Sequence, residues 1–504
     1  MALIEAAFQS QRAELGVRME FPADAVAEAE EAARRDPATD DALEDLTEVP
    51  FITIDPPGSR DLDQALCIQP TDGGGFHLWY AIADVGFFAR RGGAVEREAW
   101  LRGLTFYAPD VRAPLYPPAL GQGAASLLAG ETRPSIVFDF DLDARAEIVA
   151  LRVRHARVRS RAQLTYAQAL AHVESGGTEF ADDWAAALTE LRRFGEERRM
   201  RETERGGVSL PLLEQHVQRE AAARLGYEVE YEAPNVAEDW NAQVSLLTGH
   251  AAALRMLEAR VGVMRTMPAP EPGRVELFRR VARTLGFTWD EAMSYAEFIR
   301  SLDASHANLT PLLWQARRVS RGSDYVAFDG EPPADPMHHA LAMPYAHVTA
   351  PLRRLADRYV LDLLLQLEAG GRPTPEESAT LLRLPEVMNA TESRANKLER
   401  EVVDVAEAWA LRGREGERFA AVVLDVRHGK PEVQIESPAV RVAADRAAPD
   451  DRLEVGQRIH VKLRGVTVET GRLDFVVDSD AGTAGPGTTE TEIGGMESGG
   501  NPAE

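Results

Sequence analysis

Alternating apolar and polar residues mark strands in two separate parts of the chain, and helical patterns dominate between them. Period-two stretches rich in β-branched and aromatic residues predict strands over 49–55, 76–84, 134–143 and 147–161. From about residue 163 the pattern predicts helices over 164–173, 182–201, 236–261, 275–285, 309–321, 351–367 and 375–412. Short strands return over 418–427, 432–435, 440–443, 458–467 and 472–478. This order of elements predicts an α+β fold.

The elements divide the chain into four expected parts. The pattern of residues 1–46 predicts two short helices followed by an acidic linker. This segment is too short to form a substantial domain. Residues 47–413 form a large mixed domain, and the five short strands within 414–480 suit a small Greek-key barrel of the OB type. Residues 481–504 are rich in Gly, Thr and Glu with almost no apolar side chains, which predicts a disordered tail.

Composition indicates a soluble globular protein, with 44% hydrophobic and 27% charged residues among 504. The start of the chain lacks a basic segment followed by an apolar one, and no apolar run approaches the roughly 18 residues of a membrane span. The single cysteine, Cys67, excludes an internal disulfide framework and a cysteine-based zinc cluster. We therefore expect a cytoplasmic protein without a membrane partner.

The charge balance at first argues against a nucleic-acid partner, because 81 acidic residues face 56 basic ones and the net charge is −25. The acids are unevenly placed, however, with a strong excess over residues 20–50. Only three of the basic residues are lysines. Arginine binds phosphate through paired hydrogen bonds and stacks on bases, although a GC-rich genome produces the same bias. Net charge alone therefore does not exclude RNA.

The stretch most informative about chemistry runs from residue 51 to residue 65. A predicted strand ends at Asp55, a Pro-Pro-Gly turn follows, and Asp61 and Asp63 come next at a spacing of two. In extended backbone that spacing points both carboxylates the same way. Three carboxylates converging on a loop offer the oxygen ligands that Mg²⁺ prefers, with positions left for phosphate oxygens and water. On these residues alone a solvated acidic turn remains the alternative.

Several segments, in order, resemble the ribonuclease II (RNB) family of hydrolytic 3′→5′ exoribonucleases. The aspartate stretch resembles the family's metal-binding signature, and the further similar segments are 80–85, 104–109, 345–357 and 396–400. The resemblance implies a large RNB-type catalytic domain, followed by an OB-fold RNA-binding domain. It also implies an exoribonuclease, dependent on one or two Mg²⁺ ions with Mn²⁺ as a substitute. Such an enzyme degrades single-stranded RNA to nucleoside 5′-monophosphates and a short limit oligonucleotide. We expect a monomer.

The resemblance also implies roles for individual residues. The metal ligands it implies are Asp55, Asp61, Asp63 and Gln64, and the catalytic residues are Asp63 and Arg353. Arg353 then stabilises charge on the phosphoryl oxygens. The RNA contacts it implies are Tyr107, Tyr166, Arg353 and Glu399. Tyr107 stacks on a terminal base, and Glu399 contacts ribose or orients Arg353. Taken alone, Tyr166 is equally consistent with a core tyrosine, and Glu399 with an exposed acid paired to Lys397 or Arg400.

Two substitutions and one omission separate this chain from the family pattern. Gln64 stands where the family has a fourth carboxylate, and Gln243 falls near the place of a further acidic pair. The two cold-shock barrels that precede the catalytic domain in the family are missing. An amide oxygen coordinates a cation without adding charge, which weakens the expected second metal site. The alternative is a catalytically silent or attenuated RNB-fold protein that binds RNA or regulates.

Overall fold

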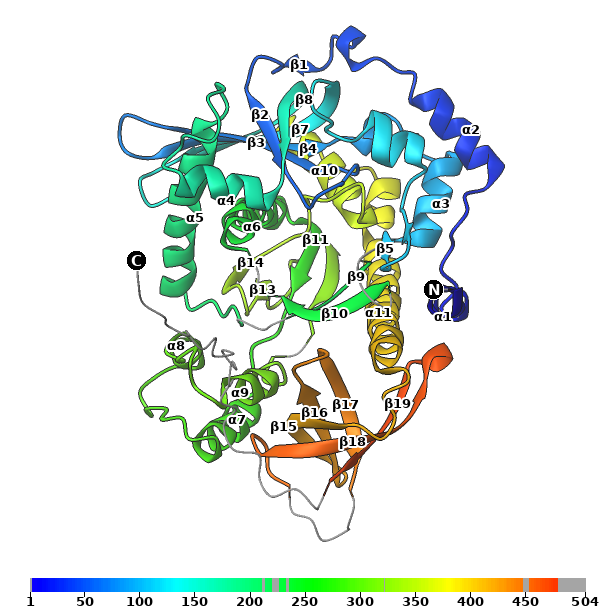
Figure 1. The fold of residues 1–504 in the computed structure, drawn as a ribbon. Helices are drawn as coiled ribbons and strands as arrows, with labels where there is room; N and C mark the ends of the chain where they lie inside the picture. The colour runs from blue at the N-terminus through cyan, green and yellow to red at the C-terminus, as the bar shows by residue number, and fades with distance from the viewer. Residues whose placement is uncertain are drawn as a thin grey trace, which may run out of the picture.

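The computed structural model describes residues 2–210, 214–219, 226–232, 235–320, 322–446 and 453–478. A mixed domain of helices and strands is followed by a β-barrel (Figure 1), which confirms the predicted α+β fold class. The tail predicted to be disordered, 481–504, lies outside the described residues.

A six-stranded sheet forms the centre of the mixed domain, in the order β1-β8-β2-β3-β4-β7 with a further pairing of β8 and β7. Its strands are β1 (Glu44–Asp45), β2 (Phe51–Ile54), β3 (Gln64–Pro70), β4 (Phe76–Ala83), β7 (Thr132–Leu142) and β8 (Ile148–Leu164). β2 runs parallel to β8 and antiparallel to β3. The two strand ends that carry the aspartate stretch therefore lie next to each other. β3 was not predicted, because it starts immediately after Asp63, within the apparent loop.

The helices of the mixed domain are α3 (Ala94–Arg102), α4 (Tyr166–Glu174), α5 (Ala186–Glu204), α6 (Val236–Ala259), α7 (Pro272–Thr284), α8 (Tyr295–Arg300), α9 (Leu309–Ala316), α10 (Leu355–Glu368) and α11 (Pro375–Leu411). Some helices, such as α5 and α10, pack against this sheet, whereas α7, α8 and α9 form a separate apolar cluster beside the barrel (Figure 1). The short strands of the mixed domain are β5 (Phe106–Tyr107), β6 (Arg112–Ala113), β9 (Glu214–Arg219), β10 (Tyr227–Glu232), β11 (Val261–Thr266), β12 (Asp324–Asp329), β13 (Met337–His338) and β14 (Met343–Pro344).

One predicted helix starts later than the sequence pattern indicates. The pattern places its start at residue 351, whereas α10 begins at Leu355. Asp357 is fully buried, and its Oδ2 accepts a hydrogen bond from the Ala350 backbone N–H at 2.7 Å and from the Arg354 guanidinium at 2.8 Å. These bonds hold residues 350–354 as a turn ahead of the helix. Arg353 therefore lies on that turn, outside the helix.

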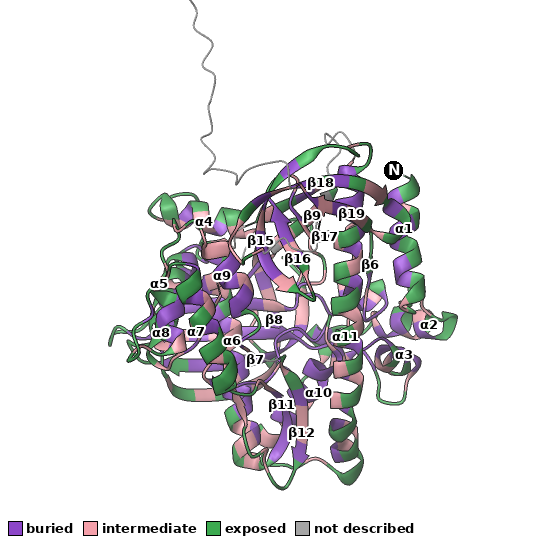
Figure 2. Cartoon of the chain, turned by 90° about the horizontal axis from the view of Figure 1, so that it is seen from below, coloured by how far each residue is buried: buried purple, intermediate pink, exposed green. Residues whose placement is uncertain are grey.

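The N-terminal segment wraps around the mixed domain. It contains α1 (Ala2–Glu14), α2 (Ala23–Ala32) and the short strand β1, which pairs in parallel with β8. Figure 2 shows α1 lying beside α11, and both helices contribute buried residues to one apolar cluster. In the acidic linker, Glu44 pairs with Arg154 at 2.7 Å and Asp45 with Arg157 at 2.9 Å. The linker acids thus neutralise arginines of β8.

The C-terminal strands close into a barrel in the order β15-β16-β17-β19-β18. They are β15 (Arg418–Arg427), β16 (Lys430–Ile435), β17 (Val440–Asp445), β18 (Arg458–Thr467) and β19 (Arg472–Val477), close to the five predicted strands. The barrel has its own apolar core. Gln315 of α9 joins it by a hydrogen bond from Nε2 to the Leu424 carbonyl at 2.5 Å, and Arg318, just after α9, forms an ion pair of 2.7 Å with Asp425.

Candidate active site

A cavity of about 420 Å³ gathers seven of the eight predicted site residues. Its walls come from the end of β2, the start of β3, the β5–β6 hairpin, the first turns of α4 and α6, and the turn before α10. The lining residues are Asp55, Pro56, Pro57, Ser59, Asp61, Asp63, Gln64, Tyr107, Arg112, Tyr166, Glu238 and Arg353. The eighth predicted residue, Glu399, is exposed on α11 and is not among them.

Asp55 follows β2 and carries an unsatisfied carboxylate oxygen. Its backbone N–H donates to the Leu164 carbonyl at 2.9 Å, which ties this end of β2 to β8. Its Oδ2 is buried and has no hydrogen-bond partner within the described part of the chain. Burial and the nearby charge of Asp61 raise the pKa of Asp55 to about 7. A buried acceptor without a partner is costly, so this oxygen is a natural position for a cation.

Asp63 joins the aspartate loop to the turn before α10. Its side chain is only 4% exposed, and its Oδ1 accepts a hydrogen bond from the Leu352 backbone N–H at 2.7 Å. Its Oδ2 lies 3.5 Å from Arg353 Nε. Burial raises the pKa of Asp63 to about 8 even though Arg353 favours the ionised form. The predicted pair Asp63 and Arg353 is therefore adjacent, although 290 positions separate the two residues in the chain.

Asp61 has a cationic partner that the sequence pattern did not reveal. Arg112 Nη1 lies 2.6 Å from Asp61 Oδ1, and the arginine is the cross-strand neighbour of Tyr107 in the β5–β6 hairpin. Each of these strands has two residues, which is too short for a periodic signal. Only the hairpin register brings Arg112 to the cavity.

Gln64, at the first position of β3, is held by its amide nitrogen. Nε2 donates a hydrogen bond to the Thr349 carbonyl, on the same turn that holds Asp63. Because the nitrogen is engaged, the amide oxygen is the end of this side chain that is able to coordinate a cation. It brings no charge to the site.

The hairpin that carries Tyr107 is attached directly to the turn that carries Arg353. The Thr105 N–H donates to the Arg353 carbonyl at 3.0 Å, and the Leu355 N–H donates to the Gly103 carbonyl at 3.0 Å. Phe106 is buried, whereas Tyr107 is 48% exposed. Successive residues of a strand point to opposite sides, so seating Phe106 in the core turns Tyr107 toward the cavity.

Two helix starts complete the cavity wall. Tyr166 is the first residue of α4, which follows a capping box between Thr165 and Gln168. Glu238 lies in the first turn of α6, behind its N-cap residue Asn235. The sequence analysis missed Glu238, but an Asn followed three positions later by Glu is a recognisable helix-start signal.

On the central helix α6, the place of the acidic pair that the resemblance implies lies away from the cavity. The family pattern places an acidic pair near Gln243, but Gln243 is buried and its Nε2 donates to Glu202 Oε2 on α5 at 3.1 Å. It does not line the cavity. The carboxylate that α6 contributes to the cavity is Glu238, more than one helical turn earlier.

The donor set fits a hard divalent cation. Among the described residues no three acidic, histidine or cysteine side chains already converge closely enough to enclose a metal. Asp61 is instead engaged by Arg112, and Asp63 by Arg353 and the Leu352 N–H. The partnerless Oδ2 of Asp55 and the raised pKa values of Asp55 and Asp63 are both features that a bound cation relieves. Carboxylate and amide oxygens are the ligands that Mg²⁺ prefers.

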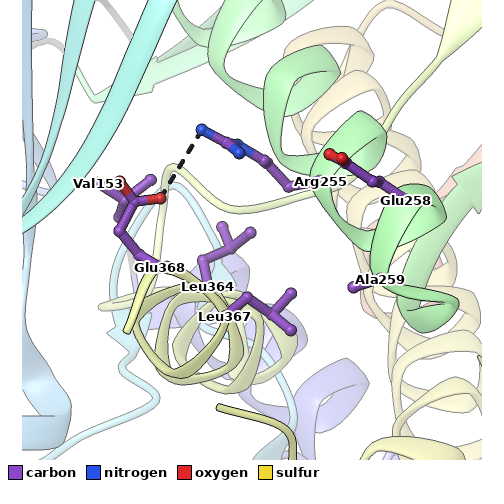
Figure 3. Close-up of a pocket in the computed structure, with 7 residues that line it drawn as sticks. All are labelled: Val153, Arg255, Glu258, Ala259, Leu364, Leu367 and Glu368. Carbon is purple, nitrogen blue, oxygen red and sulfur yellow. Dashed lines mark ion pairs between the residues drawn. The ribbon is translucent and has the colours of Figure 1, made fainter. Parts of the chain in front are cut away.

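A second cavity, of about 210 Å³, lies between β8, α6 and α10 (Figure 3). Arg255 already pairs with Glu368 at 3.8 Å and donates to the Leu151 carbonyl at 3.0 Å. Most of the remaining wall is aliphatic, from Val153, Ala259, Leu364 and Leu367. Its two carboxylates are Glu258 and Glu368, and Glu368 is already paired with Arg255, so the first cavity is the better candidate for metal-ligand chemistry. None of the described helices is long and apolar enough to cross a membrane.

Both parts of the chain are similar to known protein families. Residues 43–369 match the RNB domain, and residues 417–478 match the RNase II-type exonuclease C-terminal S1 domain. Ribonuclease R of Escherichia coli is 25% identical over 491 residues, which cover 89% of this chain and 59% of the relative. The chain thus spans little more than half the length of that relative.

Two solved structures show how widely the fold is used. Mycoplasma genitalium RNase R, in complex with ribose-methylated single-stranded RNA, is 17% identical with a TM-score of 0.84, covering 94% of this chain and 78% of that one. Yeast Ssd1, described as a pseudonuclease, is 16% identical with a TM-score of 0.65, covering 84% of this chain and 53% of that one. The similarity in fold therefore does not decide by itself whether the site is active.

Proposed function

Because this chain belongs to the RNB domain family, we propose that it is a divalent-metal-dependent exoribonuclease. It hydrolyses single-stranded RNA from the 3′ end to nucleoside 5′-monophosphates and leaves a short limit oligonucleotide. The observation that carries the proposal is the meeting of Asp55, Asp61, Asp63 and Arg353 around one cavity, from segments far apart in the chain. On a merely solvated acidic turn, the carboxylates would not gather around one cavity with an arginine from a distant segment.

The carboxylates of Asp55, Asp61 and Asp63 and the amide oxygen of Gln64 would hold one or two Mg²⁺ ions. When bound, Mg²⁺ polarises the scissile phosphate and lowers the pKa of the attacking water. The chain's own contribution is to keep the carboxylates in place, through the Asp55 N–H bond to Leu164 and the Leu352 N–H bond to Asp63. Fixed ligands of this kind need no rearrangement at the moment of reaction.

Arg353 contributes the positive charge that faces the phosphate. Its side chain is 46% exposed, so its guanidinium is open to the cavity while its Nε stays near Asp63. Asp357 holds the turn from which the Arg353 side chain projects. As hydrolysis proceeds, negative charge accumulates on the phosphoryl oxygens, and hydrogen bonds from Arg353 grow stronger at that point.

The aromatic residues determine which RNA fits. Tyr107 offers its ring to the 3′-terminal base, and Tyr166, beside Asp55, is a second contact to the terminal nucleotide. A cavity that stacks an unpaired terminal base favours single strands over duplex ends. Glu399 stays a proposed ribose contact, which RNA would have to reach on the exposed face of α11.

The direct test is to incubate uniformly labelled single-stranded RNA with the protein and Mg²⁺ and to separate the products by chromatography. We expect nucleoside 5′-monophosphates, and no release when EDTA replaces Mg²⁺. Release of 3′-monophosphates or of internal fragments would contradict the proposal.

Replacing Tyr107 by Ala should lengthen the limit oligonucleotide without abolishing cleavage. Stacking on an aromatic side chain is worth about 1–3 kcal/mol per base, so terminal nucleotides bind too weakly once the ring is lost. Tyr107→Phe keeps the ring and should retain the wild-type limit product. The products are measured on a sequencing gel, and an unchanged length in Tyr107→Ala would remove Tyr107 from the RNA contacts.

Replacing Gln64 by Asp should lower the Mg²⁺ concentration that gives the half-maximal rate, by about tenfold, because one more negative charge joins the site. Asp cannot donate to the Thr349 carbonyl as Gln64 does, so the exchange also breaks that tie. Gln64→Asn is the matched control, with the length of Asp but no charge. If Asp and Asn shift the midpoint equally, Gln64 lies outside the metal shell.

Metal binding should stabilise the protein more at high pH. The folded protein without metal holds Asp55 and Asp63 at pKa values of about 7 and about 8, whereas unfolded Asp titrates near pH 4. Stability without metal therefore falls as the pH rises from about 4 to about 8. Mg²⁺ favours the ionised carboxylates, so its effect on Tm should be larger near pH 8.5 than near pH 6. A Mg²⁺-induced shift that is independent of pH would contradict this assignment.

A further inference from the structure

The N-terminal helix α1 is joined to the hairpin of Tyr107 by an almost buried ion pair. Arg12 Nη1 lies 2.6 Å from Asp110 Oδ1, and Arg12 Nη2 lies 2.9 Å from Asp110 Oδ2. The two side chains are only 9% and 13% exposed. Asp110 lies in the turn between β5 and β6, so both prongs of the guanidinium hold the tip of the hairpin. Paired contacts of this type fix orientation as well as distance.

The same helix shares an apolar cluster with the inner side of the hairpin. Ile4 and Phe8 of α1 share an apolar cluster with Phe106 of β5, Ala113 of β6 and residues of α11. Phe106 and Ala113 are cross-strand partners, so the inner side of the hairpin belongs to the apolar cluster that α1 and α11 also line. Two-residue strands do not hold their own shape in water. The hairpin therefore depends on these neighbours for its position.

The opposite side of the hairpin faces the cavity. Its cross-strand pair is Tyr107 and Arg112, and Arg112 is the partner of Asp61. The inner and outer pairs are neighbours on the same two short strands. A shift of the inner pair therefore also moves the outer pair, whose side chains point the opposite way. Any loosening of the contact with α1 is thus passed on to the aromatic ring and to one of the carboxylates.

We propose that Arg12, acting through Asp110, is a positioning residue that sets the place of Tyr107 relative to Asp63 and so fixes how the RNA 3′ end is seated. This inference rests on the proposed function, in which Tyr107 stacks on the terminal base. It gives the N-terminal segment a task in substrate binding. A displacement of about 1 Å at a binding group is enough to affect a reaction strongly.

The chain offers a matched control for a merely structural role. Arg18, in the same N-terminal segment, makes a similar two-pronged ion pair with Glu98, at 2.7 and 3.0 Å. Glu98 lies on α3, not on the hairpin, and retains Arg102 as a partner at 3.0 Å. Arg18→Ala removes another two-pronged contact of the segment, made by an arginine whose side chain is 45% exposed, and leaves the Arg12–Asp110 pair intact.

The experiment measures how much the 3′-terminal base contributes to binding, in EDTA so that no cleavage occurs. Affinity for a single-stranded RNA is compared with affinity for the same RNA that has an abasic 3′-terminal nucleotide. We expect a ratio of about tenfold in the wild type, as a stacking contact provides, and a ratio near one in Tyr107→Ala. Arg12→Ala and Asp110→Asn should each reduce the ratio at least about threefold, with little change in affinity for the abasic RNA. Arg18→Ala should keep the wild-type ratio.

Two combinations separate positioning from general weakening. In Tyr107→Ala, the further change Arg12→Ala should have no additional effect on the ratio, because Arg12 acts through that ring. Exchanging the charges, Arg12→Asp with Asp110→Arg, should restore part of the ratio. A wild-type ratio in both Arg12→Ala and Asp110→Asn, or an additive effect in the Tyr107→Ala background, would overturn the inference. Failure of the wild type to release mononucleotides would contradict only the proposed hydrolysis, since binding is measured without metal.

Discussion

Asp63→Asn should reduce RNA hydrolysis at least about 10³-fold, which corresponds to about 4 kcal/mol of lost transition-state stabilisation. The exchange removes one negative charge from the proposed metal site and weakens the orientation of Arg353, whose Nε lies 3.5 Å from Asp63 Oδ2. An Asn oxygen still accepts the hydrogen bond from the Leu352 N–H, so the turn should keep its shape. The rate is measured in single turnover with excess enzyme.

RNA binding provides the control for this variant. The proposed stacking residues Tyr107 and Tyr166 are untouched, so affinity for single-stranded RNA in EDTA should remain within about threefold of wild type. Removing a buried acid whose pKa is about 8 should also raise the stability of the metal-free protein above neutral pH. Undiminished turnover in Asp63→Asn would refute the assignment of the metal site.

Arg353→Lys should lower kcat by about 10²–10³-fold, the usual cost of losing a hydrogen-bond donor to a developing anion. Lys keeps the positive charge but lacks the flat, two-pronged arrangement of donors. KM should change much less than kcat, because the lost interactions strengthen mainly in the transition state. In a second variant, Arg353→Ala, added guanidinium should partly restore the rate. A raised KM with an unchanged kcat would show that Arg353 only binds the RNA in its ground state.

The parts of the fold that local patterns specify were predictable from the sequence. The five barrel strands alternate clearly, and the long helix α11 follows a Thr-Pro start whose capping box, between Thr374 and Glu377, forms in the structure. The start of α10 was misplaced because a tertiary contact sets it. Asp357 accepts hydrogen bonds from the Ala350 N–H and from Arg354, which hold these residues in a turn. Local sequence propensity does not predict such bonds.

Local patterns likewise indicate only some of the residues that line the cavity. The spacing of two between Asp61 and Asp63 was sufficient to predict that both carboxylates point the same way. Tyr107 and Arg353 were placed by family resemblance, since a single tyrosine or arginine has no pattern. Neither a local pattern nor the resemblance indicated Arg112, because this residue reaches the cavity through the register of a two-residue ladder. Glu238 does have a local signal, because Asn235 and Glu238 together mark the start of α6.

We propose that this cavity hydrolyses RNA from the 3′ end, although Gln64 stands where the resemblance implies a carboxylate and a similar fold occurs in a pseudonuclease. The most direct measurement follows 5′-labelled single-stranded RNA over time with Mg²⁺, for the wild type and for Asp63→Asn, with all products resolved by length. The wild type should shorten the RNA from its 3′ end to a limit oligonucleotide, while Asp63→Asn should bind the RNA and leave it intact. RNA that is bound but uncut by the wild type at every Mg²⁺ concentration would contradict this proposal.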